Sequence, residues 1–283
     1  MNCCKMWGCF RIAAALALIA SCAVMAGKVI SVPSSEAQTI SHAFIKAKIG
    51  DTILVDKGVY RERIFVENGV ALVAKWAEGT VIDGKGRGTV VTLGKNSSIT
   101  GFEIRNGTIG VFSKHPGNAI RNCRIVQNWQ TGIICVRHLP SIEDNVIAFN
   151  RASGIQGWDV RSTAAAIAHN TIAFNGNNGI AMGGGSNAII ERNILAFNER
   201  FGIKVTAESE KVKVTGNNIY KNLWSLTKPI PAGNYVYDPQ FASPRGKMDF
   251  TVEGKAPCAE CVEDKAPGAR LFPSYKKNSG SLY

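Results

Sequence analysis

The sequence has few acidic side chains. It carries 21 aspartates and glutamates against 33 lysines and arginines, which gives a formal net charge of +12. From Arg105 to Arg200 the acids are only Glu143, Asp144, Asp159, Glu191 and Glu199. A glycoside hydrolase needs two carboxyl groups that flank the scissile bond, and a calcium site needs several carboxylate oxygens. The central part of the chain therefore shows neither an acid pair for glycoside hydrolysis nor a calcium site.

The sequence also lacks long apolar segments and helical periodicity after residue 26. No later segment is long and apolar enough to cross a bilayer. A hydrophobic content of 45% and a charged content of 19% exclude a largely disordered chain. No recognised nucleic-acid-binding motif appears, so the positive charge favours acidic polymers other than nucleic acid.

What is present is a repeat. Four segments share one pattern, and their closing asparagines are 25, 23 and 24 residues apart. These segments are Asn145–Asn150, Asn170–Asn175, Asn193–Asn198 and Asn217–Asn222. A Gly-Ile dipeptide keeps the same period and begins at Gly132, Gly154, Gly179 and Gly202. Two motifs that stay in phase over four periods indicate a structural repeat.

Each repeat unit holds about three short apolar runs bounded by glycine, asparagine and serine, which is typical of strands. We therefore predict an all-β fold, a single-stranded parallel β-helix with three short strands in each coil of about 22–25 residues. The expected interior columns are Ile147, Ile172, Leu195 and Ile219, and Phe149, Phe174, Phe197 and Tyr220. The asparagines should form hydrogen-bonded ladders at one corner, where asparagine tolerates left-handed backbone geometry.

The Asn-x-Ile-x-x-Asn and Gly-Ile coils resemble the right-handed parallel β-helix repeats of the pectin-lyase-like superfamily. The segment Ala37–Tyr60 resembles the start of such chains, and Asp238–Phe241 with Asp249 and Phe250 resembles their closing segment. The resemblance covers about residues 30–272 and implies a right-handed β-helix that faces carbohydrate. Because this fold supports many chemistries, the resemblance does not define an activity.

Residues 1–26 have the features of a secretory signal, since Lys5 and Arg11 precede a short apolar run. Two interpretations of its end remain open. A conventional signal peptidase would cleave after Ala26, whereas a lipobox-like sequence would make Cys22 the lipidated first residue. Either form places the protein outside the cytoplasm, as a secreted, periplasmic or lipid-anchored protein.

The expected organisation is a signal at 1–26, a β-helix with an N-terminal cap at 27–242, and a closing segment with a tail at 243–283. The cap is predicted as an amphipathic helix over Ser34–Ala47 that begins at Ser34 or Ser35. Such a helix would cover the apolar end of the first coil.

Four cysteines follow the signal. Cys123 and Cys135 are expected to fill interior strand positions, and Cys258 and Cys261 are expected to form a disulfide in an oxidising compartment. The glycine-rich loop Asp83–Gly88 hints at a phosphate cradle, but a strand rather than a helix follows it. We therefore interpret this loop as a corner between coils.

Candidate binding residues follow the Gly-Ile strand in three successive coils. They are Lys114 and His115, Arg137 and His138, and Trp158, Asp159 and Arg161. Lys114, Arg137 and Asp159 are 23 and 22 residues apart, so they would stack at about 4.8 Å per coil. Solvated strand-end charges are the alternative interpretation. Basic groups that converge beside an aromatic ring nevertheless favour a binding site.

We therefore predict an exported protein that binds or processes acidic, uronate-type polysaccharide or another anionic envelope polymer. If it is an enzyme, metal-free β-elimination or epimerisation fits better than glycoside hydrolysis, because a lysine, arginine or histidine could take the proton at the sugar C5. The alternative is a non-catalytic envelope scaffold or adhesin. We expect a monomer with no metal, cofactor or nucleic acid, which contacts membrane only through a lipid anchor.

Overall fold

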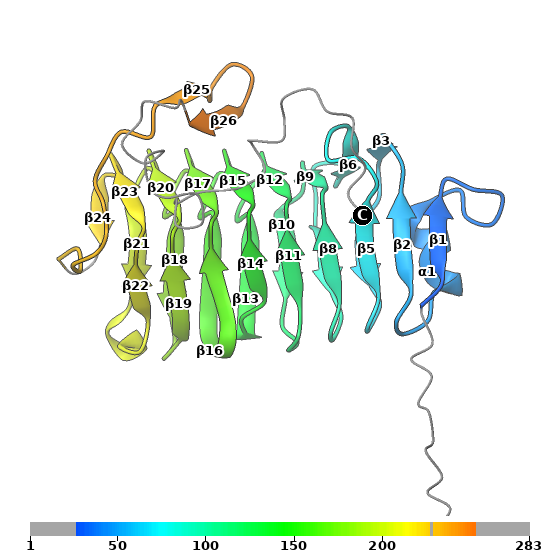
Figure 1. Cartoon of the computed structure of the whole chain (residues 1–283), viewed down its shortest axis with the longest axis horizontal. Helices are drawn as coiled ribbons and strands as arrows, with labels where there is room; N and C mark the ends of the chain where they lie inside the picture. The colour runs from blue at the N-terminus through cyan, green and yellow to red at the C-terminus, as the bar shows by residue number, and fades with distance from the viewer. Residues whose placement is uncertain (1–26, 227–228, 253–283) are drawn as a thin grey trace, which may run out of the picture.

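Three stacks of parallel strands build one solenoid (Figure 1). The computed structural model describes residues 27–226 and 229–252, and of residues 162–164 it describes only the backbone. The predicted signal, Cys22, Cys258 and Cys261 lie outside the described residues. Strands one coil apart pair in parallel, as β15 (Val146–Ala148) does with β17 (Thr171–Ala173). The parallel β-helix predicted from the repeat is confirmed.

The remaining strands fall into the same three stacks. The first stack contains β1 (Val29–Val32), β2 (Thr52–Val55), β5 (Ala71–Ala74), β8 (Ser98–Thr100), β11 (Ala119–Arg121), β14 (Ser141–Glu143), β19 (Asn187–Glu191) and β22 (Lys213–Thr215). The second contains β4 (Ile64–Val66), β7 (Thr89–Leu93), β10 (Ile109–Ser113), β13 (Ile133–His138), β18 (Ile180–Gly183), β21 (Phe201–Val205) and β24 (Trp224–Leu226). The third contains β3 (Gly58–Tyr60), β6 (Thr80–Asp83), β9 (Glu103–Arg105), β12 (Arg124–Val126), β15, β17, β20 (Ile194–Ala196) and β23 (Asn218–Tyr220). The long strand β16 (Ile155–Ala168) passes through a corner and belongs to both the first and the second stack.

Aliphatic side chains fill the interior of the coils. The predicted column of Ile147, Ile172, Leu195 and Ile219 is confirmed, because these residues align in register and are fully buried. The glycine of the Gly-Ile motif is needed for close approach between coils. A Cβ atom on Gly154 would lie 2.8 Å from the carbonyl oxygen of Gly179 and 3.0 Å from Nδ2 of Asn175.

The predicted asparagine ladders are also confirmed. Asn150 donates from its backbone nitrogen and from Nδ2 to Oδ1 of Asn175, at 3.2 and 3.0 Å. Asn175 repeats the contact on Asn198, with its Nδ2 2.9 Å from Oδ1. The left-handed backbone falls one residue earlier than expected, because Phe149 and Phe174, not the asparagines that follow them, have φ values of 56° and 55°.

The phenylalanine column forms, but its predicted place inside the coils is wrong. Phe149 and Phe174 stack with ring centroids 5.3 Å apart, and Phe174 and Phe197 stack at 4.9 Å. These rings pack on the outside of the third stack, where they belong to a second apolar cluster with Phe250. The antiparallel hairpin of β25 (Phe241–Ser243) and β26 (Asp249–Val252) covers them (Figure 1). The left-handed corner explains the error, since it directs the side chain away from the interior.

The N-terminal cap is a shorter helix than predicted. Helix α1 (Ile40–Lys46) begins after Thr39, whose hydroxyl accepts a hydrogen bond from the backbone nitrogen of His42 at 3.1 Å. Ser34 instead closes a local turn by accepting from Ala37 N. The helix buries Ile40, Ala43 and Phe44 against β1, β2 and β4, as the amphipathic pattern predicts. A short 3-10 helix, η1 (Ala207–Ser209), interrupts a later corner. No helix within the described residues is long and apolar enough to cross a membrane.

Candidate functional site

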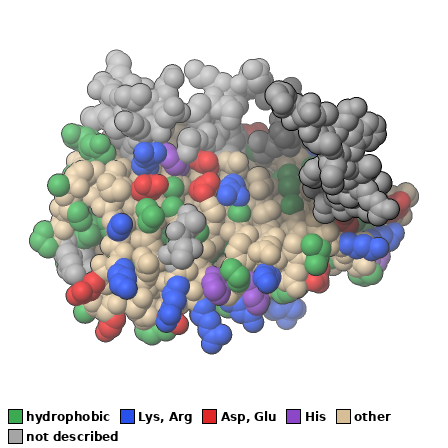
Figure 2. All heavy atoms as spheres, turned by 60° about the horizontal axis from the view of Figure 1, so that its bottom comes forward, with side chains coloured by type: hydrophobic (Ala, Val, Ile, Leu, Met, Phe, Trp, Pro, Cys, Tyr) green, Lys and Arg blue, Asp and Glu red, His purple; other side chains and the backbone are tan. Residues whose placement is uncertain are grey.

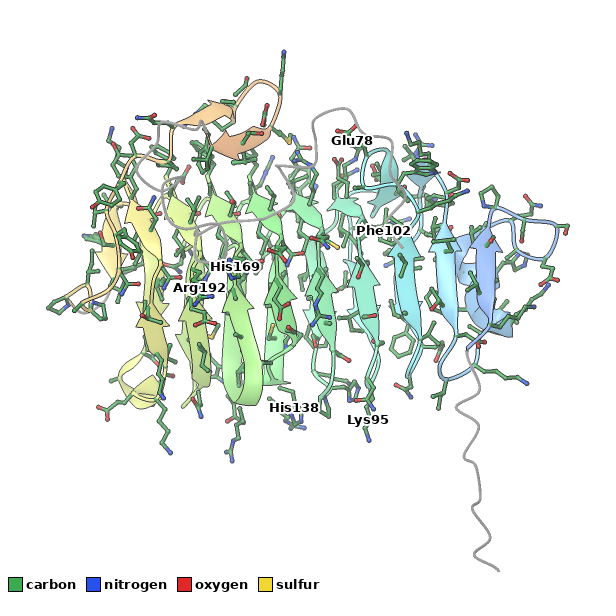
Figure 3. All side chains as sticks on the ribbon, viewed as in Figure 1. Glu78, Lys95, Phe102, His138, His169 and Arg192 are labelled. Carbon is green, nitrogen blue, oxygen red and sulfur yellow. The ribbon has the colours of Figure 1, made fainter. Side chains whose placement is uncertain are left out.

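The predicted site residues lie on the edge where strands of the second stack turn into strands of the first. Figure 2 shows Lys and Arg side chains with histidine along this edge, and Figure 3 places Lys95 and His138 there. We call this surface the basic edge. It comprises Lys95, Lys114, His115, Arg137, His138, Trp158, Asp159 and Arg161. The structure thus brings all the predicted residues to one edge and adds Lys95 from the preceding coil.

The predicted stacking within the basic edge is off by one residue. Ser113 pairs with Cys135, so the same register places Lys114 opposite Val136 rather than opposite Arg137. In the next coil Val136 pairs with Trp158, and His138 pairs with Arg161. The register shifts between these two pairs, which is the signature of a β-bulge. Counting a constant step failed here because corner lengths differ from coil to coil.

The cations of the basic edge face solvent with little compensating charge. Lys95, Lys114 and Arg137 are exposed, and His115 and His138 are half-buried. The ion pair closest to this edge joins Arg161 Nε to Asp159 Oδ1 at 3.6 Å, with exposed side chains that contribute little stability. Among the described residues, no other member of the basic edge forms an ion pair. The edge therefore carries a net positive field toward solvent.

Trp158 lies flat on the neighbouring coil. A Cβ atom on Gly183 would lie 3.0 Å from Cζ3 of its ring, and one on Gly184 would lie 2.9 Å from Cε2. Gly184 has a φ of 65°, which an L side chain rarely adopts. The glycines thus make room for the indole, and Trp158 is still 57% exposed. One face of the ring is supported by the coil while much of the side chain stays available to a ligand.

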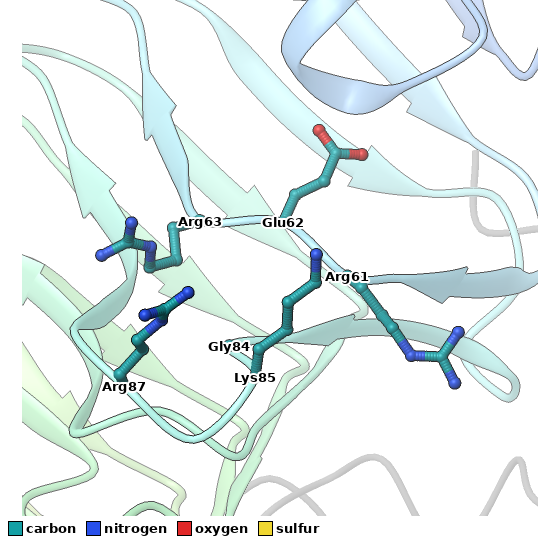
Figure 4. A pocket seen from close by; sticks show the side chains of 6 residues that line it. All are labelled: Arg61, Glu62, Arg63, Gly84, Lys85 and Arg87. Atoms are coloured by element: carbon teal, nitrogen blue, oxygen red, sulfur yellow. The ribbon is translucent and has the colours of Figure 1, made fainter.

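A second group of cations lines a hollow near the N-terminal end of the solenoid (Figure 4). It has a volume of about 460 Å³ and is lined by Arg61, Glu62, Arg63, Gly84, Lys85 and Arg87. The sequence analysis missed this group. A signal was present, because Lys85 follows Arg61 by 24 residues and Arg87 follows Arg63 by 24 residues (85 − 61 and 87 − 63), which is one coil.

The fold and the basic edge define a parallel β-helix solenoid with a cationic surface that carries an exposed aromatic ring. The chain belongs to the family described as periplasmic copper-binding protein (NosD), which matches residues 45–239, more than half of its length. That description names a periplasmic protein, in agreement with the extracytoplasmic location that the N-terminal segment predicts. No curated protein matches the sequence.

Several solved pectin methylesterases are similar in fold. One in complex with a hexasaccharide has a TM-score of 0.44 and 13% identity, and the match covers 77% of this chain and 95% of that chain. PemA from Erwinia chrysanthemi has a TM-score of 0.35 and 12% identity, with 78% and 96% covered. The Aspergillus niger enzyme has a TM-score of 0.33 and 12% identity, with 74% and 89% covered. At these identities the likeness concerns the fold alone.

The described residues do not fit a copper centre. Proteins hold copper mainly through histidine, cysteine and methionine. In the described part of the chain, no three side chains of His, Cys, Asp or Glu come together. Cys135 and Met182 share a register column with Gly157 between them, but both are enclosed in the solenoid. Burial raises the pKa of the Cys135 thiol to about 12, which disfavours the thiolate that a metal would need.

Proposed function

We propose that this extracytoplasmic β-helix binds acidic, uronate-type polysaccharide along the basic edge. The observation that carries the proposal is the exposed indole of Trp158, seated on two glycines beside a row of unpaired cations. Carboxylates along an acidic glycan would meet the cations, and the apolar face of a sugar ring would lie on the indole. Aromatic surfaces with a few placed polar groups are typical of ligand sites.

The spacing of the cations favours a polymer over a single sugar. Lys95, Lys114, Arg137 and Arg161 come from four successive coils, so they span three coil steps, or about 14 Å. Each coil corner is fixed by the strands on both sides, so the charges are held in place before a ligand arrives. A prearranged row of this kind lowers the ordering cost of binding an extended polyanion.

The test is binding of oligogalacturonate and alginate by isothermal titration calorimetry at low and high salt. Replacing Lys114 and Arg137 together by alanine should weaken binding by about tenfold or more, which corresponds to about 1.4 kcal/mol. The thermal midpoint should stay unchanged, because exposed charges contribute little to stability. Affinity of the wild type should fall as salt rises.

A charge-matched control separates a site from general attraction. Lys46 and Lys48 are exposed near α1, and changing both to alanine removes the same charge elsewhere. This control should bind the glycans as the wild type does. Equal weakening in both double variants, or undiminished binding by the Lys114 and Arg137 variant, would refute the basic edge as the site. A loss of binding with the appearance of unsaturated products in the wild type would instead indicate lyase activity.

A further inference from the structure

The hollow near the N-terminal end is built by corners of two adjacent coils. One corner, Arg61–Arg63, joins β3 to β4, and the other, Gly84–Gly88, joins β6 to β7. Register pairs Tyr60 with Ile82 and Ile64 with Val91, so the second corner is five residues longer, (91 − 82) − (64 − 60). The extra length makes a loop that projects beside the shorter corner and encloses space between them.

The longer corner is held rigidly by its neighbours. Every backbone amide from Gly84 to Gly88 donates a hydrogen bond within the protein. The acceptors, in order, are Arg105 O, Asp83 Oδ1, Asn106 O, Gly84 O and Thr108 Oγ1. No amide of this loop is therefore left to cradle a phosphate, which confirms the interpretation of the loop as a coil corner. Any ligand in the hollow must be held by side chains.

The acids near the hollow are already engaged. Glu62 accepts hydrogen bonds from Ile40 N at 3.2 Å and Ser41 N at 2.9 Å, and thereby caps α1. Asp83 binds Lys85 N, Asn106 and Arg105. Partial burial opposes ionisation of Asp83, but these hydrogen bonds outweigh it and lower its pKa. Both carboxylates are thus ionised and directed at other partners.

The cations of the hollow have no such partners. Within the described residues, Arg61, Arg63, Lys85 and Arg87 form no ion pair, and all four are exposed. Figure 4 shows Arg63 and Arg87 on one side of the hollow with Lys85 beside them, whereas Arg61 extends away. The Arg63 side chain lies across Gly88, since a Cβ atom there would meet its Nη1 at 2.7 Å. Two guanidinium groups and an ammonium group therefore face one space without an anion between them.

We propose that this hollow is a binding site for a tetrahedral oxyanion, a phosphate or sulfate monoester group, held by Arg63, Lys85 and Arg87. The planar fork of arginine matches two oxygens of such a group, and lysine supplies a point charge. The side chains come from a corner whose backbone is fully hydrogen-bonded, so the site is arranged before the anion binds. This site is separate from the basic edge and needs no sugar ring contact.

The probe is inorganic phosphate, titrated into the exported domain at low salt and followed by calorimetry, with sulfate as a second anion. Changing Arg63 and Arg87 together to glutamine should weaken phosphate binding at least about tenfold, since each hydrogen bond to a charged group contributes about 1.5–3 kcal/mol. Changing both to lysine keeps the charge but removes the forked donors and should give an intermediate loss. The charge-matched control changes Lys211 and Lys213, at the other end of the solenoid, to alanine and should bind phosphate normally.

Two further ligands distinguish the source of the anion. Binding of a hexose 6-phosphate without binding of phosphatidylglycerol vesicles indicates a phosphorylated glycan, and the reverse indicates a lipid headgroup. Both supporting results must be lost in the Arg63 and Arg87 glutamine variant. The proposal is overturned if the wild type binds neither phosphate nor sulfate, or if the glutamine and control variants bind alike. Retention of oligogalacturonate binding by the glutamine variant keeps this test independent of the basic edge.

Discussion

The asparagine ladder and the basic edge are both built from coil corners, yet they differ in how their residues repeat. In the ladder the same residue type returns in coil after coil, and each side chain hydrogen-bonds to the next. On the basic edge the equivalent positions change from lysine to arginine to tryptophan and glycine, and the side chains face solvent. Repetition with mutual contact marks structure, whereas variation with exposure marks a surface free to specialise.

The most severe test of this comparison removes one ladder residue. Asn175 accepts from Asn150 and donates to Asn198 Oδ1 and to Ile147 O. Changing Asn175 to alanine strands several buried polar groups at once. We expect a loss of about 4 kcal/mol in the free energy of unfolding, measured by urea denaturation.

The matched control is Gln156→Ala, which changes an exposed amide side chain on the outer face of β16. Its effect should stay within about 0.5 kcal/mol, as for most surface substitutions. Similar losses for the two variants would mean that the ladder contributes no more than an ordinary surface amide.

A smaller loss is expected at the phenylalanine stack, which repeats like the ladder but lies outside the coils. Phe174 contacts Phe149, Phe197 and Phe250, and Arg245 lies over its ring at 5.0 Å. Changing Phe174 to alanine should cost about 2–3 kcal/mol, below the value for a fully enclosed ring. Hydrogen exchange should accelerate in β25 and β26 and remain slow in β15 and β17. Faster exchange in the strands with an unchanged hairpin would contradict the outside position.

These two variants also mark what the sequence could predict. The period of the asparagine and Gly-Ile motifs predicted the ladders and the column of Ile147 and Ile172, because stacking follows from spacing alone. It could not place Phe174, since a single left-handed residue decides which face a side chain takes. It misaligned Lys114 with Arg137 for a related reason, because one β-bulge shifts every later pair. The hollow at Arg63 and Arg87 escaped prediction because it depends on the length of one corner.

Glu62 sharpens the comparison from the other side, as a residue outside the ladder that is nevertheless structural. Its carboxylate accepts from Ile40 N, Ser41 N and the Ser41 hydroxyl, which are groups of the cap rather than of a ligand. Changing Glu62 to alanine should destabilise the protein by about 1–2 kcal/mol, the range for a lost helix cap. Glutamine should restore part of this loss because it keeps an acceptor oxygen. Thermal unfolding and exchange of the Ala43 amide would report both effects.

The smallest stability effect is expected where the largest binding effect is predicted. Trp158 is exposed over more than half of its surface and rests on glycines, so its removal leaves no cavity inside the coils. Changing Trp158 to alanine should lower the free energy of unfolding by less than about 1 kcal/mol. The same change should weaken oligogalacturonate binding by about tenfold, equivalent to about 1.4 kcal/mol. Phenylalanine at this position keeps an aromatic face and should retain most of the affinity. If alanine binds as well as tryptophan, the indole is only a cover for Gly183 and Gly184, and the cations alone attract the polymer. If alanine instead destabilises the fold as much as the Asn175 change does, a varied and exposed corner residue is as structural as a repeated one, and the distinction between the two corner rows fails.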